Sequence, residues 1–165
     1  MRAIRYEEYE GPLSDEVLSA MAQVASETIW PAGQTQPDTP IDLNKHIEWL
    51  KTETRGQTWV HAGLAYEGST ILGYKLGRSN DPRSFESCLG GVRPEARRLG
   101  IASELSRRQA AWCRTKRFQF IVSETSYNNR AMLILNLKQG FYVSGSYLCR
   151  QKHLKVRLEK ALEPS

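Results

Sequence analysis

The fold is decided by residues 92–103, which read VRPEARRLGIAS. The segment joins an apolar, strand-like run to a helical pattern, and a proline stands between them. The first turn of a helix exposes unpaired N–H groups and the positive end of the helix dipole, which together bind phosphate. Gly100 and Ala102 leave this backbone open to an anion, and Arg97 and Arg98 add positive charge. The stretch predicts a cradle for phosphate or diphosphate, although it matches neither GxxxxGK[ST] nor GxGxxG.

A second stretch, residues 129–141 (NRAMLILNLKQGF), is typical of a helix that ends before Gly140. Together the two stretches resemble the GNAT superfamily of N-acyltransferases. Residues 97–102 resemble its Arg/Gln-x-x-Gly-x-Gly/Ala signature, and residues 129–141 resemble its Asn-x-x-Ala/Met helix followed by Lys-x-Gly-Phe. The resemblance implies the GNAT fold, acetyl-CoA as cosubstrate and direct attack of an acceptor amine on the thioester.

In that family, the loop that matches residues 97–102 holds the diphosphate of acetyl-CoA through backbone N–H groups. The resemblance implies that the preceding strand end pairs with the pantetheine arm, in a slot opened where neighbouring strands part. It also implies that a backbone N–H among residues 90–92 faces the thioester carbonyl and stabilises the oxyanion. The cofactor residues implied are Val92, Arg97, Arg98, Gly100, Ile101, Ala102, Ser103 and Asn129. For Asn129, a simple helix cap remains the alternative.

The resemblance also implies a candidate general base, Glu86. Glu86 lies six residues before Val92, where histone-acetylating members of the family carry theirs. Even spacing places both on one side of the strand if no bulge intervenes, but the family favours a bulge. The alternative is a strand-edge or substrate-binding carboxylate, and Glu124 is the second candidate base.

The sequence departs from the family where many members carry a tyrosine that protonates the leaving thiolate. Asn136 stands at that place, and an amide cannot act as this acid. Tyr142 is kept as a catalytic candidate, although its position does not match the motif.

Periodicity predicts a mixed α/β fold of one domain over residues 1–165, with a sheet that is partly antiparallel. The expected order is β–α–α–β–β–β–α–β–α–β–β. Strands are expected at 2–9, 58–66, 70–77, 85–92, 118–123, 141–149 and 154–158. Helices are expected from 14 to 30, after Asp42, from about 99 and over 129–139, with a loop at 31–40.

The charge of the chain is concentrated in one region. The net charge is +5, yet residues 93–117 alone hold eight Lys and Arg against two Glu. Most such runs are solvated helix faces. The alternative is an anionic partner, and the position of Arg97 and Arg98 favours the phosphates of a small cofactor over nucleic acid.

The composition excludes several classes. No stretch approaches the roughly 20 apolar residues of a membrane span, and the N-terminal residues do not form a signal peptide. The three cysteines and three histidines are widely separated, which favours reduced thiols in a cytoplasmic protein and gives no metal motif.

The leading hypothesis is an acetyl-CoA-dependent N-acetyltransferase acting on a small-molecule or peptide amine. The alternative is a GNAT-fold module that senses acyl-CoA or binds nucleic acid without turnover. The sequence does not decide between a monomer and a homodimer. The acceptor is expected between the N-terminal helices, the loop at 31–40 and the last hairpin. Five aromatic residues are candidates to line this pocket, and the alternative is that they belong to the ordinary core. They are Trp30, Trp49, Trp59, Tyr142 and Tyr147.

Overall fold

The computed structural model describes residues 3–28, 42–150 and 152–163. The elements in this part of the chain are β1 (Ile4–Glu10), α1 (Asp15–Thr28), α2 (Leu43–Thr54), β2 (Trp59–Glu67), β3 (Thr70–Ser79), β4 (Ser84–Val92), a 3-10 turn (Pro94–Ala96), α3 (Ile101–Thr115), β5 (Phe120–Ser126), α4 (Arg130–Lys138), β6 (Tyr142–Leu148) and β7 (Leu154–Ala161). The predicted order of strands and helices is confirmed. The expected loop at 31–40 and the last residues of the first helix, including Trp30, lie outside the described residues.

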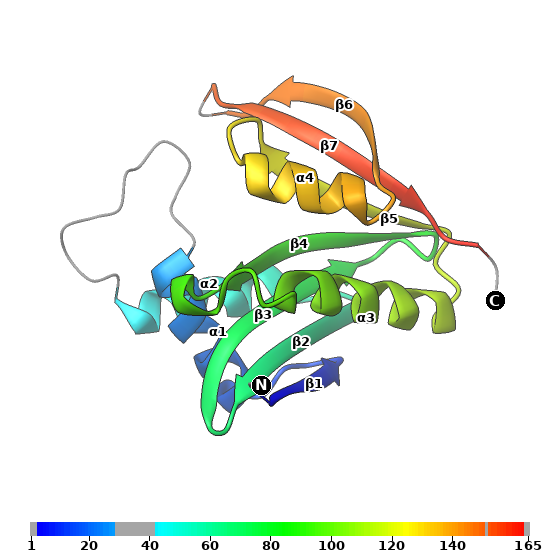
Figure 1. Ribbon diagram of the computed structural model, residues 1–165. Coiled ribbons are helices and arrows are strands. Elements are labelled where there is room, and N and C mark those ends of the chain that lie inside the picture. Colours follow the sequence, from blue (N-terminus) through cyan, green and yellow to red (C-terminus); the bar gives the residue numbers. More distant parts are fainter. Residues whose placement is uncertain (1–2, 29–41, 151, 164–165) are drawn as a thin grey trace.

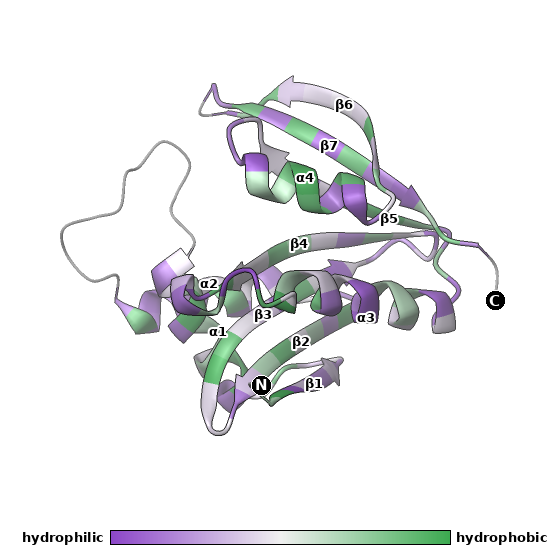
Figure 2. Cartoon of the chain, in the orientation of Figure 1, coloured by the Kyte–Doolittle hydropathy of each residue, from purple (hydrophilic) through white to green (hydrophobic). Residues whose placement is uncertain are grey.

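The strands form one mixed sheet in the order β1-β2-β3-β4-β5-β7-β6 (Figure 1). Among the strands of the described ranges, β4 and β5 pair in parallel, and the other neighbours are antiparallel. Helices α1 and α2 pack on one face through the largest apolar cluster, and α3 packs on the other through two smaller ones. Hydrophobic residues therefore occupy both faces of the central strands (Figure 2).

Local sequence signals account for most element ends. The Asp42 carboxylate accepts the Asn44 N–H at 2.9 Å and caps α2, as predicted. Gly140 follows α4 with a φ of 85°, a left-handed conformation that glycine adopts without strain.

The strand expected at 118–123 begins two residues later, at Phe120. The Phe118 N–H donates to the Cys113 carbonyl at 3.0 Å and closes the end of α3, after Arg117 has turned to a φ of 66°. The start of this apolar run therefore ends α3, and the rest of it forms β5.

The sheet opens between β4 and β5. Their pairing is limited to residues 84–86 of β4 against 120–122 of β5, after which β5 continues along β7. Figure 1 shows the two halves of the sheet separating beyond this point, with α3 beside one half and α4 beside the other. The parting of strands predicted from the sequence is confirmed.

Candidate functional site

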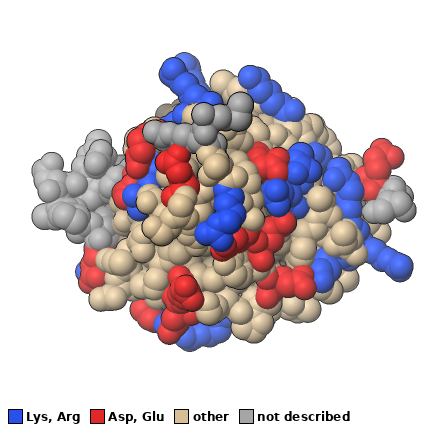
Figure 3. All heavy atoms as spheres, turned by 60° about the horizontal axis from the view of Figure 1, so that its bottom comes forward, with Lys and Arg blue, Asp and Glu red and all other residues tan. Residues whose placement is uncertain are grey.

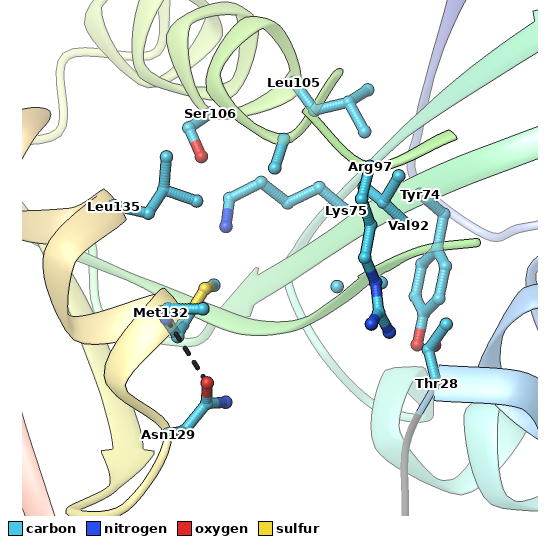
Figure 4. A pocket seen from close by; sticks show the side chains of 14 residues that line it. Thr28, Tyr74, Lys75, Val92, Arg97, Leu105, Ser106, Asn129, Met132 and Leu135 are labelled. Carbon is cyan, nitrogen blue, oxygen red and sulfur yellow. Dashed lines mark hydrogen bonds between the residues drawn. The ribbon is translucent and has the colours of Figure 1, made fainter. Parts of the chain in front are cut away.

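A cavity of about 500 Å³ lies where β4 and β5 part. It is bordered by the two central strands β3 and β4, the first turns of α3, the helix α4 and the end of α1 (Figure 4). The predicted cofactor residues that line it are Val92, Arg97, Ala102 and Asn129. Apolar side chains of β4, α3 and α4 line the cavity together with several polar groups, a composition typical of small-molecule sites.

The N-terminus of α3 opens onto this cavity without a side-chain cap among the described residues. Gly100 precedes the helix with a φ of 79°, and Arg98 also has a left-handed φ, of 65°. The first N–H groups of a helix have no partner within it, so those that follow Gly100 remain available to an anion. Arg97 lines the cavity beside them.

The remaining cradle residues contribute in different ways. The Ile101 side chain is buried in the core with Leu72 and Leu105, so only its backbone faces the cradle. Arg98 and Ser103 do not line the cavity, which leaves Arg97 as the arginine that borders it.

Asn129 performs the structural role that the sequence left open. Its side-chain oxygen accepts the Met132 N–H at 3.2 Å and caps α4. The residue also borders the cavity (Figure 4), so capping and contact with a ligand are compatible.

The end of β4 presents backbone groups toward the opening in the sheet. The Arg93 N–H donates to the Leu72 carbonyl at 2.8 Å, so this pair is a hydrogen-bonded pair of the antiparallel ladder. Hydrogen-bonded and non-bonded pairs alternate, which directs the N–H and C=O groups of Gly90 and Val92 away from β3. They point to the side from which β5 has departed.

A bulge at Cys88 separates the two ends of β4. Leu76 pairs with Leu89, but the next residue of β3 pairs with Ser87, so Cys88 has no opposite residue. Val92 packs toward α3, whereas Glu86 bonds to Arg78 on the face that carries α2. Same-side placement of Glu86 and Val92 is expected only in the absence of a bulge. The bulge that the family resemblance favours is present and places the two residues on opposite sides.

Glu86 borders a second cavity, of about 450 Å³, on the α2 face. Its carboxylate lies 3.3 Å from the Arg78 guanidinium, which also pairs with Glu53 of α2. Glu124, the second candidate base, borders the same cavity from β5 and lies 3.4 Å from Arg157. The structure therefore brings both candidate bases together, away from the cradle.

Tyr147 connects this acidic cavity to the last hairpin. Its hydroxyl donates to the Glu124 carboxylate at 2.6 Å, and this bond raises the pKa of Tyr147 to about 12. The phenol is therefore neutral at physiological pH and holds Glu124 in place.

Neither residue considered for the leaving-group acid reaches the main cavity. Tyr142 is 49% exposed on the edge strand β6 and donates to Glu159 at 3.3 Å. Asn136 is buried and donates to the Ser123 hydroxyl at 3.4 Å, so it packs α4 against β5. Neither one lines the main cavity.

Sequence reasoning missed two cavity residues on β3, Tyr74 and Lys75. The Tyr74 hydroxyl is buried without a hydrogen-bond partner among the described residues, and burial raises its pKa. Lys75 is only 7% exposed. The available signal was a lysine inside the apolar run of a central strand, where an uncompensated charge is rare.

The basic residues of α3 are largely paired within the chain. Arg107 and Arg108 bond to Glu104 at 2.7 and 2.8 Å, and Lys116 bonds to Glu10 of β1 at 2.9 Å. Figure 3 shows acidic and basic side chains interspersed on this side of the molecule. The charge run is therefore not a continuous basic surface.

The described ranges contain neither a membrane-spanning helix nor a metal-binding cluster. None of their helices is long and apolar enough to cross a membrane. Within the same ranges, no cluster of His, Cys, Asp and Glu is arranged to hold a metal ion.

Solved structures with the same fold are numerous, and their sequences have diverged from this one. The N-acetyltransferase of Staphylococcus aureus Mu50 superposes with a TM-score of 0.69 at 21% identity, covering 95% of this chain and 99% of its own. The ribosomal-protein-S18-alanine N-acetyltransferase of Escherichia coli gives 0.70 at 10%, covering 96% of each chain. The protein yncA of Salmonella typhimurium, whose structure holds its cofactor acetyl-CoA, gives 0.68 at 16%, covering 96% and 95%. These similarities establish the fold.

The family assignment rests on a sequence model. A search of the curated proteins gives no match. The model of the acetyltransferase (GNAT) family matches residues 21–141, which include the cradle, the cavity and both parted strands. The chain belongs to the acetyltransferase (GNAT) family.

Proposed function

We propose that this chain is an N-acetyltransferase that transfers the acetyl group of acetyl-CoA to an amine of a small molecule or peptide, by direct attack in a ternary complex. The observation that carries the proposal is the cavity where β4 and β5 part, which is bordered by the N-terminus of α3, a helix start without a side-chain cap.

The residues present fit acetyl-CoA. The free N–H groups at the start of α3 and the Arg97 guanidinium suit a diphosphate. The outward backbone groups of Gly90 and Val92 suit the amides of the pantetheine arm, which would extend the sheet from β4 as an added strand. Asn129 would contact the cofactor from α4 while it caps that helix.

Acetyl-CoA supplies an activated acyl group in this reaction. With the pantetheine arm along β4, the thioester carbonyl would lie at Gly90, whose N–H points into the opening. A fixed backbone N–H stabilises the negative charge that develops on this oxygen during attack, a contribution worth about 3 kcal/mol in comparable sites.

The acceptor amine would approach from the α2 face. Glu86 and Glu124 lie there and attract an ammonium group, which must lose a proton before it can attack. Glu86 is the proposed base because it lies on the strand that carries the thioester site, just before the Cys88 bulge. Its ion pair with Arg78 fixes the carboxylate in one position.

Release of CoA thiol in the presence of a panel of amines and N-terminal peptides tests the proposal. We expect thiol release that depends on one class of amine, with saturation in both substrates. The alternative function, an acyl-CoA-binding module, is favoured by Asn136, which fills the acid position with a packing amide. Tight acetyl-CoA binding without release for any amine would support that alternative.

The nucleic-acid version of the alternative loses its main support, because Arg107 and Arg108 already pair with Glu104. Affinity for RNA that falls in the variants Arg107→Glu and Arg114→Glu would restore it.

A further inference from the structure

Lys75 is a buried lysine in the centre of the sheet whose amine faces the proposed cofactor cavity. It lies on β3, between β2 and β4, and only 7% of it is exposed. A lysine in this position normally needs a carboxylate partner. In the described part of the chain, its Nζ has neither an ion pair nor a hydrogen bond, and Figure 4 shows it pointing into the cavity.

The Lys75 side chain crosses β4 over a glycine. Lys75 pairs with Gly90 of β4, and a Cβ on Gly90 would lie 3.8 Å from the Lys75 Cγ, an ordinary van der Waals distance. The lysine side chain therefore passes close to β4 at this point. Its amine thereby reaches the space between β4 and α4, beside Ser106 and Leu135 (Figure 4).

Among the described residues, no carboxylate pairs with the amine to compensate its charge. The titratable groups that act on it are the thiols of Cys88 on β4 and Cys113 on α3, and it acts in turn on His61 of β2. Burial raises the pKa of Cys88 to about 12 and raises that of Cys113, so both thiols are neutral. Burial also lowers the pKa of Lys75 to about 8, within the range where an amine exchanges protons at physiological pH.

Among the described residues, the other candidates to protonate a leaving thiolate are less suited than the buried lysine. Tyr74 also borders the cavity, but burial raises the pKa of its hydroxyl and makes it a weaker acid. Asn136 occupies the position of the family's acid and is bonded to Ser123, and Tyr142 lies on the outer strand. Arg97 lies by the cradle and does not release protons at this pH.

We propose that Lys75 is the acid of the transfer reaction and donates a proton from its Nζ to the sulfur of the departing CoA. The inference rests on the proposed function. As the C–N bond to the acceptor forms and the C–S bond breaks, the sulfur takes the Nζ proton and leaves as a neutral thiol. Lys75 becomes a neutral amine and recovers a proton from solvent, which balances the proton that the acceptor loses to its base.

The position along β4 favours the sulfur over the diphosphate. The thioester site is at Gly90, directly opposite Lys75, whereas the cradle begins at Arg97, beyond the end of the strand. Ser106, which borders the cavity next to the amine, lies one helical turn beyond Ala102 of the cradle.

The thiol acidity of bound CoA tests the inference without knowledge of the acceptor. Calorimetry first establishes CoA binding to the wild type, to Lys75→Met and to the exposed control Lys45→Met. The ultraviolet absorbance of the thiolate is then titrated in each complex. A cation near the sulfur lowers the pKa of the bound thiol, so we expect it to be about 1 to 3 units lower in the wild type and the control than in Lys75→Met.

A CoA analogue without the sulfur distinguishes contact with the thiol from contact with the rest of the cofactor. We expect it to bind wild type and Lys75→Met equally. Equal thiol acidity in the two proteins, or equal weakening of CoA and the analogue by Lys75→Met, would overturn the role of Lys75 and leave the proposed function intact. Absence of CoA binding to the wild type would instead overturn the proposed function and this inference with it.

Discussion

Glu86 and Val92 lie on the same strand but face opposite sides of the sheet, because the bulge at Cys88 reverses the alternation between them. Val92 borders the cavity on the α3 side, and Glu86 borders the cavity on the α2 side. A single strand therefore presents one face to the proposed cofactor and the other to the proposed acceptor.

The role of Glu86 as base predicts a specific kinetic defect. Glu86→Gln keeps the size of the side chain but cannot accept a proton, so kcat should fall about 100-fold at neutral pH. The defect should shrink as pH rises, because the acceptor amine then loses its proton without help. Steady-state kinetics across pH with the best amine of the panel measures this.

Glu124→Gln is the matched control for that experiment, since it removes a carboxylate from the same cavity. It should raise KM for the amine and leave kcat within a few-fold of wild type. Full activity of Glu86→Gln at every pH, or a loss of kcat confined to Glu124→Gln, would exclude Glu86 as the base.

The close approach of α1 to the cavity predicts that Gly91 does not tolerate a side chain. A Cβ at this position would overlap the Thr28 Oγ1, which donates to the Val24 carbonyl at 2.7 Å. Gly91→Ala should therefore lower the free energy of unfolding by about 1–3 kcal/mol, measured by urea denaturation. Gly145→Ala is the control, because a Cβ there has nothing within 4 Å.

A double-mutant cycle locates the clash. Adding Thr28→Ala to Gly91→Ala should recover part of the lost stability, because it removes the atom that the new methyl group meets. If the effects of the two substitutions on the free energy of unfolding were strictly additive, the destabilisation by Gly91→Ala would not come from contact with Thr28.

Burial of Lys75 predicts an unusual dependence of stability on pH. Its pKa is lowered from 10.5 to about 8 in the folded protein, so the unfolded chain binds more protons between these two values. Stability must then rise with pH across this window, relative to a variant without the amine. Below it, Lys75→Met should be more stable than wild type by about 3 kcal/mol.

Urea denaturation of both proteins at pH values through the window measures the difference. We expect the difference in free energy of unfolding between Lys75→Met and wild type to be constant at low pH. It should become smaller as pH rises toward the ordinary lysine pKa. A difference that stays the same throughout would mean that the folded protein does not perturb Lys75.

Local features of the chain were predictable from the sequence. The uncapped start of α3 at Gly100, the Asp42 cap and the Gly140 stop each depend on a few neighbouring residues. The order of the elements followed from the same short-range periodicity. Even spacing alone could not place Glu86, because a bulge depends on the register with β3, which short-range patterns do not contain. The expectation of a bulge came from the family resemblance.

Features that depend on distant residues were not predictable in this way. Glu10 of β1 neutralises Lys116, which follows α3, and the two residues are far apart in sequence. Lys75 enters the cavity by passing over Gly90, which lies on another strand. Such pairings require the three-dimensional arrangement of the sheet.

The central claim is that the N-terminus of α3 holds the diphosphate of acetyl-CoA, and Gly100→Val tests it most directly. A branched residue is strained at a φ of 79°, but a Cβ there meets nothing within 4 Å, so the core should stay folded while the cradle changes shape. The measurement is a calorimetric titration of acetyl-CoA into wild type and variant, with the thermal unfolding of each as the check on folding. We predict one-to-one binding to the wild type and no measurable binding to a folded Gly100→Val. Unchanged affinity in the folded variant would contradict the account.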